Sequence, residues 1–166
     1  MKKEDLPNIL PVFPLSNFII FPRTTVPLNI FEPRYLQMVN DSMKNHRMIG
    51  MIQPKKSGSL KKPDLYEIGC IGKITSFNET DDGRILIILN GICRYETISE
   101  INSDKLYREC EVIFEKFSND LIENNEQVKF SDLKQVFNDL KKLFEQQGYQ
   151  INWNDIEKQN VRQTIN

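Results

Sequence analysis

Histidine and tryptophan are nearly absent from this sequence, which contains one of each. The single histidine, His46, leaves little choice for general acid–base catalysis, because histidine is the side chain most often used for it. Its position near the end of a predicted helix is typical of a solvated or dipole-facing histidine. The motifs GxxxxGK[ST], GxGxxG, GxSxG and HExxH are missing as well. These gaps disfavour nucleotide hydrolysis and the common hydrolase mechanisms, and they favour a binding or scaffolding module.

Cysteine is also scarce, with Cys70, Cys93 and Cys110 as the only three. An odd number without close pairs argues against a disulfide framework. A zinc site completed by His46 is an alternative, but structural zinc sites usually take their ligands from pairs such as CxxC. We therefore expect buried free thiols, with no metal and no cofactor.

Long apolar runs are absent too, since no window approaches the roughly 18 apolar residues of a membrane span. The start, MKKEDLPNIL, has no apolar region of a secretory signal. The composition is 39% hydrophobic and 27% charged, with a net charge of −1. These values predict a cytoplasmic globular protein without membrane contact, built as one domain or as one domain with an appendage.

Prolines interrupt the apolar first segment, FPLSNFIIFPRTTVPLNIFEPRYLQMV. Because proline is confined to strand edges, ends and turns, the runs 9–13, 18–21 and 26–31 are predicted to be short strands. The period then becomes helical at Leu36, Val39 and Met43, with Pro33 suited to a first turn. A helix is therefore expected from about residue 32 to 45, and we expect Glu32 and Arg34 to form an ion pair at its entrance.

The middle of the chain has the pattern of β-strands. Strands are predicted over 48–52, 65–77, 84–90, 92–101 and 106–114, with tight turns at Asp82-Gly83 and Asn90-Gly91. Together with the first segment, they predict an α+β fold, a small and partly closed antiparallel barrel with one inserted helix.

The pattern changes again after Phe117. Residues 118–127 are polar and predicted to be a linker, and an amphipathic helix is expected over 131–147, between an N-cap at Ser131 and Gly148. We therefore predict a domain over 1–117 and a helical subdomain over 118–166. The apolar stripe is unfinished at the end of the sequence, so this subdomain is expected to be truncated. Its open apolar face could also support a homodimer.

Several segments resemble the amino-terminal, substrate-binding domain of Lon proteases, in particular the small bacterial proteins that carry this domain alone. They are LPVFPL, FPRTTVPLNIFEPRYLQMV, RMIGMIQP, LYEIGCIGKITSFNETDDGR and NGICRYE. The resemblance implies a PUA-like pseudo-barrel followed by a helical bundle. It also implies binding of unfolded or damaged polypeptides, without the ATPase and protease domains of full Lon enzymes. Hydrolase activity is therefore not expected here.

Our main hypothesis is a non-catalytic polypeptide-binding module with an adaptor or chaperone-like role, partnered by a protease or chaperone. An exposed apolar patch is expected where the first segment meets the helix, at Phe18, Ile20, Phe31 and Tyr35; the alternative is that these side chains fill the core. A second hypothesis is a PUA-like RNA-binding module, suggested by the basic stretch 44–73. This basic stretch lacks interleaved aromatic residues, however, which disfavours RNA binding. An enzyme with an unrecognised site is a third alternative.

Overall fold

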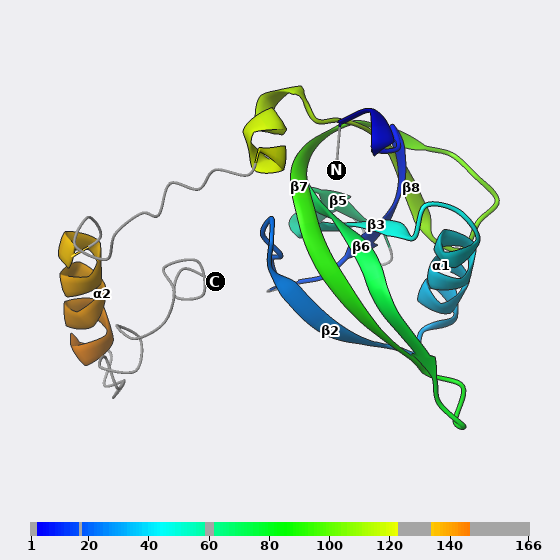
Figure 1. The fold of residues 1–166 in the computed structure, drawn as a ribbon, viewed down its shortest axis with the longest axis horizontal. Helices are drawn as coiled ribbons and strands as arrows, with labels where there is room; N and C mark the ends of the chain where they lie inside the picture. Colours follow the sequence, from blue (N-terminus) through cyan, green and yellow to red (C-terminus); the bar gives the residue numbers. More distant parts are fainter. Residues whose placement is uncertain (1–2, 17, 59–61, 123–133, 147–166) are drawn as a thin grey trace. The chain divides into compact units, whose positions relative to one another are not determined.

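The computed structural model describes residues 3–16, 18–58, 62–122 and 134–146. The chain divides into two compact units, 1–122 and 123–166. The first unit is mostly β-sheet with a few helices (Figure 1). Its strands are β1 (Ile9–Pro14), β2 (Thr25–Ile30), β3 (Met48–Ile52), β4 (Pro54–Gly58), β5 (Pro63–Leu65), β6 (Ile68–Glu79), β7 (Ile85–Ile101) and β8 (Arg108–Ile113). Its helices are η1 (Lys3–Asp5), α1 (Pro33–Lys44) and η2 (Glu115–Leu121), and the second unit contains α2 (Lys134–Gln146).

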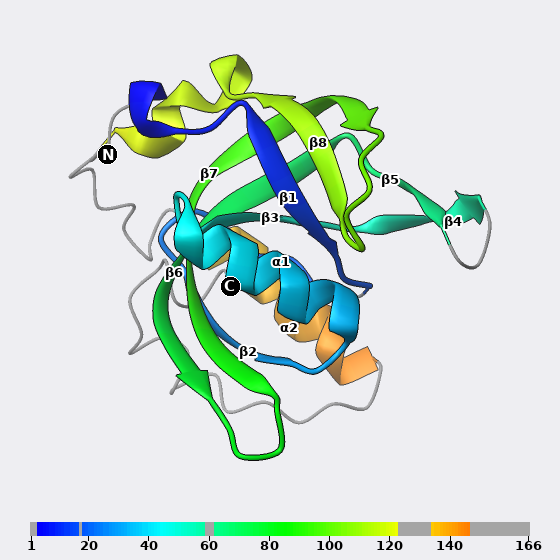
Figure 2. The same cartoon turned by 90° about the vertical axis from the view of Figure 1, so that its right-hand side faces the viewer.

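Six strands form one curved sheet in the order β2-β7-β6-β3-β1-β8, and β4 and β5 form a separate ribbon. The long strand β7 pairs with β2 and β6 along its first part and with β8 near its end, which bends the sheet around (Figure 2). The predicted, partly closed antiparallel barrel needs one correction, because strands β1 and β3 are parallel. Strand β7 pairs with both β6 and β8, while β2 pairs with β7 alone and remains an edge strand among the described residues. The sheet is therefore only partly closed.

Two apolar clusters stabilise the first unit. One joins α1 to β2, β3, β6 and β7; it contains Phe13, Ile20, Ile30, Tyr35, Met38, Val39, Ile49, Met51, Cys70, Ile74, Ile85, Ile87, Leu89 and Tyr107. The other joins β1, β3, β6, β7 and β8; it contains Leu6, Leu10, Val12, Met48, Ile52, Ile71, Cys93, Tyr95, Cys110, Val112 and Phe114. The sheet therefore has apolar side chains on both of its faces.

Helix α1 confirms the predicted helix almost to the residue. It begins at Pro33, with Glu32 as the N-cap residue, and ends at Lys44. Its side chains Tyr35, Met38 and Val39 are buried. The predicted ion pair is present as well, with Arg34 Nη2 2.7 Å from Glu32 Oε2. Both side chains are about half exposed, so the pair stabilises the helix entrance by at most about 1 kcal/mol.

The strand predictions over 9–13, 26–31, 48–52 and 106–114 are confirmed as β1, β2, β3 and β8. The predicted strand over 18–21 is wrong, because this segment is irregular. The predicted turn at Asn90-Gly91 is also wrong, because β7 runs through it without a break. Between the pairs Ile71↔Cys93 and Gly72↔Gly91, β7 has one extra residue, a bulge that bends the strand instead of reversing it.

Gly91 is required by a close approach between distant segments. A Cβ at this position would lie 2.1 Å from the carbonyl oxygen of Phe21. The Gly91 N–H donates to Thr24 O at 2.8 Å, and the Arg23 N–H donates to Gly91 O at 2.7 Å. Arg23 has a φ of 68°, a left-handed conformation, and lies with Thr24 opposite Gly91 in a bulge. These bonds hold the residues after segment 18–21 against β7.

Pro27 lies in the middle of β2 without interrupting the ladder. Because hydrogen-bonded residues alternate along an antiparallel pair, the bond at Thr24 directs the main chains of Val26 and Leu28 toward β7. The nitrogen of Pro27 therefore faces the free edge of the sheet. The missing N–H is one that a further strand would need.

The predicted linker over 118–127 is wrong for its first residues, which belong to η2. The predicted helix over 131–147 is confirmed as α2 for residues 134–146. Ser131, Gly148 and residues 123–127 lie outside the described residues. The boundary between 117 and 118, the truncated subdomain and the homodimer stay predictions. Among the residues that the structure describes, no helix combines the length and apolar character needed to cross a bilayer.

Candidate binding pocket

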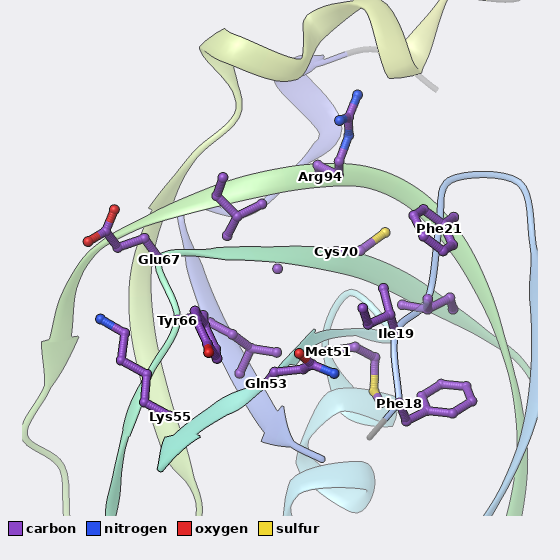
Figure 3. Close-up of a pocket in the computed structure, with 14 residues that line it drawn as sticks. Phe18, Ile19, Phe21, Met51, Gln53, Lys55, Tyr66, Glu67, Cys70 and Arg94 are labelled. Carbon is purple, nitrogen blue, oxygen red and sulfur yellow. The ribbon is translucent and has the colours of Figure 1, made fainter. Parts of the chain in front are cut away.

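An apolar pocket with a volume of about 510 Å³ opens on the first unit (Figure 3). Segment 18–21, the end of β3, the start of β6, and single residues of β4 and β7 form its wall. The lining residues are Phe18, Ile19, Ile20, Phe21, Met51, Ile52, Gln53, Lys55, Tyr66, Glu67, Ile68, Gly69, Cys70 and Arg94.

The pocket lies where β3 and β6 stop pairing. Their ladder ends at Met51↔Cys70, and the next bond between the two chains runs from Tyr66 N–H to Gln53 O at 3.0 Å. Residues 67–69 therefore lie opposite Ile52 alone. A local mismatch of this kind re-aims side chains, and it leaves room between the two strands.

Gly69 and Tyr95 determine the shape of the adjacent wall. A Cβ on Gly69 would lie 2.4 Å from the Tyr95 ring and 2.6 Å from Met51 O. Tyr95 is completely buried, and its hydroxyl donates to Met51 O at 3.4 Å. A side chain at position 69 would therefore displace the aromatic ring that supports this part of the pocket.

Four large hydrophobic side chains in the lining are strongly exposed. The exposed fractions are 58% for Ile19, 42% for Phe21, 52% for Tyr66 and 54% for Ile68. Single exposed hydrophobic residues are ordinary, but several gathered around one concavity mark an interaction surface. The pocket is therefore the strongest candidate site among the described residues.

The structure separates the four residues predicted to bind polypeptide. Phe18 and Ile20 line the pocket, although Ile20 is only 3% exposed. Tyr35 is buried in the cluster beneath α1, with its ring centroid 4.2 Å from that of Phe13. Phe31 is 63% exposed but lies outside the pocket lining. A binding role for the four residues stays a prediction.

Sequence reasoning missed Ile19, Phe21, Tyr66 and Ile68. Ile19 and Phe21 belong to the same apolar run as the predicted residues. Because the run is not a strand, its residues do not alternate between two faces, and the sequence does not show which of them are exposed. Tyr66 and Ile68 precede Gly69 in the YEIGCIGKI stretch. Their exposure depends on the interrupted β3–β6 ladder, which has no sequence signal that we recognise.

Arg94 forms a charged border between the pocket and η2. Its guanidinium donates to both carboxylate oxygens of Asp120, at 2.9 and 2.8 Å, and lies 4.6 Å from the Phe117 ring centroid. These hydrogen bonds lower the pKa of Asp120. Arg23 also donates to Ile122 O, so two arginines hold the end of this unit. Asp120 thus neutralises the charge of Arg94.

The three cysteines are buried free thiols, as the sequence predicted. Burial raises the pKa of Cys70, which lines the pocket, and of Cys93 to about 12, and that of Cys110 to about 11. No group of three metal-binding side chains is found in the described part of the chain.

The raised pKa of Cys70 predicts slow alkylation. At pH 8 a thiol with a pKa of about 12 is about one ten-thousandth ionised, whereas an ordinary cysteine is roughly one quarter ionised. Iodoacetamide should therefore label the native protein on the order of a thousand times more slowly than the urea-unfolded protein. Mass spectrometry of timed samples measures this ratio. Equal labelling rates would show that the pocket does not bury the thiol.

The first unit is thus a small, mostly β domain with an apolar pocket. Residues 9–164 match the family described as the ATP-dependent protease La (LON) substrate-binding domain. This match covers most of the chain, so the protein belongs to that family. The resemblance inferred from the sequence is thereby confirmed.

The chain is similar to one small part of several bacterial Lon proteases. The chain is 29% identical to the Lon protease of Flavobacterium johnsoniae over 109 residues, which are 64% of this chain and 13% of that protein. It is 32% identical to the Lon protease of Desulfosudis oleivorans over 105 residues, 61% of this chain and 13% of that one. The chain thus spans a small part of these relatives, their non-catalytic N-terminal domain.

A solved structure agrees with this fold. The Lon N-terminal domain protein from Xanthomonas campestris has a TM-score of 0.52 and 26% identity, covering 64% of this chain and 59% of that one.

Proposed function

We propose that this protein is a non-catalytic polypeptide-recognition module that binds apolar segments of unfolded or damaged chains in the pocket beside segment 18–21. The observation that carries the proposal is the gathering of Ile19, Phe21, Tyr66 and Ile68 around one cavity. The substrate-binding family to which the chain belongs supports the same conclusion.

The physical chemistry of the pocket suits such a ligand. Its volume of about 510 Å³ lies in the range of roughly 300–1,000 Å³ that ligand sites occupy. Burial of apolar surface in the pocket contributes roughly 25 cal/mol to the free energy of binding for each Å² removed from water. Folded proteins bury their large apolar side chains, whereas unfolded chains expose them. The proposed site therefore distinguishes unfolded chains from folded ones by their exposed apolar side chains.

The recognition domain in this proposal is residues 1–117, related to PUA-like pseudo-barrels, with residues 118–166 as the helical subdomain. The biological role is that of an adaptor or chaperone-like protein in quality control, acting with a protease or a chaperone. Homodimer formation and a cytoplasmic location are parts of the same proposal.

Fluorescence anisotropy tests the binding function. The probe is a labelled polypeptide made permanently unfolded by reduction and carboxymethylation, and the control is the same polypeptide in its native, disulfide-bonded form. We expect a saturable rise in anisotropy for the unfolded form. The native form should bind at least about tenfold more weakly. Equal affinities for the two forms, or no binding, would contradict the proposal.

The RNA-binding hypothesis stays a prediction, and the same assay contains its test. Lys62, in the basic stretch, lies 2.9 Å from Glu100, which partly neutralises it. A labelled mixed RNA should give no rise in anisotropy at low salt. Salt-dependent binding of RNA without binding of unfolded polypeptide would favour the alternative.

A further inference from the structure

The main chain of segment 18–21 has hydrogen-bonding groups without partners. Among the described residues, no hydrogen bond is formed by the N–H or C=O groups of Phe18, Ile19 or Ile20. Main-chain groups without a protein partner are bonded to water, which the main chain of a bound polypeptide can replace. Three consecutive residues of this kind lie directly along the wall of the pocket (Figure 3).

The chain after these residues is held by hydrogen bonds. The Phe21 N–H donates to Thr24 Oγ1 at 3.2 Å, and Phe21 O accepts the Thr24 N–H at 3.2 Å. These bonds restrain the carboxyl-terminal end of the stretch, which lowers the entropic cost of binding to it.

The rim of the pocket also carries charges that a purely apolar ligand would leave without partners. Lys55 Nζ lies 5.8 Å from the Tyr66 ring centroid. Within the described part of the chain, neither Lys55 nor Glu67 forms a salt bridge. A polypeptide has acidic and basic side chains that complement both, in addition to main-chain groups. This complementarity favours a polypeptide over a neutral lipid or a small apolar molecule.

We propose that the occupant of the pocket is an extended polypeptide segment whose main chain hydrogen-bonds to main-chain groups within residues 18–20. This inference rests on the proposed function and adds the conformation and sequence pattern of the ligand. In an extended chain, successive side chains point to opposite faces, so alternate residues enter the pocket. The recognised pattern is thus apolar residues separated by single polar residues, the strand-addition mode of binding.

An amphipathic helix does not meet the same requirements. A helix satisfies its own main-chain groups within the chain, so it would leave those of segment 18–21 without partners. Its apolar residues recur at intervals of three and four. Peptides with identical composition but different order therefore distinguish the two modes.

Anisotropy titrations of the full chain with short labelled peptides test this inference. The first peptide alternates Phe and Ile with Ser and Thr, and the second has the same residues rearranged to helical spacing. We expect the second to bind at least about tenfold more weakly. Equal affinity for both peptides would overturn the inference.

Methylation of main-chain nitrogens tests the hydrogen bonds themselves. One version of the alternating peptide carries a single N-methyl group on a main-chain nitrogen at an odd-numbered residue. A matched version carries it at the next, even-numbered residue, whose main-chain nitrogen points to the opposite side of an extended chain. Since an edge strand bonds through every second residue, one version should bind about tenfold more weakly and the other should bind like the parent. Unchanged affinity for both versions, or equal weakening of both, would overturn the inference.

The two proposals fail in different ways. If the unfolded polypeptide binds but the alternating peptide has no advantage, only the extended-chain inference is wrong. If neither the unfolded polypeptide nor any peptide binds, the proposed function is wrong as well.

Discussion

Replacement of Gly91 by alanine is expected to lower the free energy of unfolding of the first unit by about 3 kcal/mol, as overpacking of a tight site does. The added Cβ would lie 2.1 Å from Phe21 O and 3.2 Å from a side-chain carbon of Ile20. The first of these atoms belongs to the backbone, so no side-chain rotation relieves the contact. Segment 18–21 must move away from β7, and the wall of the pocket moves with it.

Urea unfolding followed by circular dichroism measures the loss of stability in Gly91→Ala, and the anisotropy assay measures the loss of binding. Gly83→Ala is the matched control. Gly83 has a φ of 79°, but a Cβ added there would have no heavy atom within 4 Å, so this change costs only the backbone strain, about 1–2 kcal/mol. Binding should be unchanged in the control. A Gly91→Ala protein as stable as Gly83→Ala would show that the two segments do not pack as described.

Simultaneous replacement of Ile19 and Ile68 by serine is expected to weaken binding of unfolded polypeptide about a hundredfold. Each change removes a large apolar side chain from the lining, and a loss of roughly 1.4 kcal/mol per side chain is a factor of about ten in affinity. Both side chains are more than half exposed in the free protein, at 58% and 54%. At about 0.5 kcal/mol for each surface substitution, the double change should leave the free energy of unfolding within about 1 kcal/mol of its original value.

The double variant Ile9→Ser/Ile98→Ser is the control for this experiment. Ile9 and Ile98 are each 53% exposed, and neither lines the pocket. The control therefore removes the same chemical groups at similar exposure, and its affinity should stay within about twofold of the original protein. Equal losses in the two double variants would mean that general surface hydrophobicity, and not the pocket, binds the polypeptide.

Local sequence signals predicted the elements whose structure is determined locally. Pro33 and the helical spacing of Leu36, Val39 and Met43 gave helix α1 with nearly correct ends. Strand β3 was predicted from a continuous apolar run, and all five of its residues are buried. In these segments, propensity, capping and burial all favour the same structure.

The errors arose where a distant segment decides the outcome. Asn90-Gly91 has the sequence of a tight turn, but the glycine is there because Phe21 O comes so close to it. Segment 18–21 has the composition of a strand, yet it forms no strand pairing with the other described residues. The pocket depends on both of these features, together with the end of the β3–β6 ladder. Of the lining residues, the sequence therefore predicted only Phe18 and Ile20.

The position of Pro27 has a consequence for the proposed binding of unfolded chains, which aggregate readily. Strand β2 has an open side along which a captured chain could add, followed by another, in the manner of a growing fibril. The proline ring removes a hydrogen-bond donor from the centre of that side. Under the proposed function, Pro27 therefore disfavours the edge of β2 as a second binding site at which bound chains could aggregate, and the pocket is the proposed site of binding.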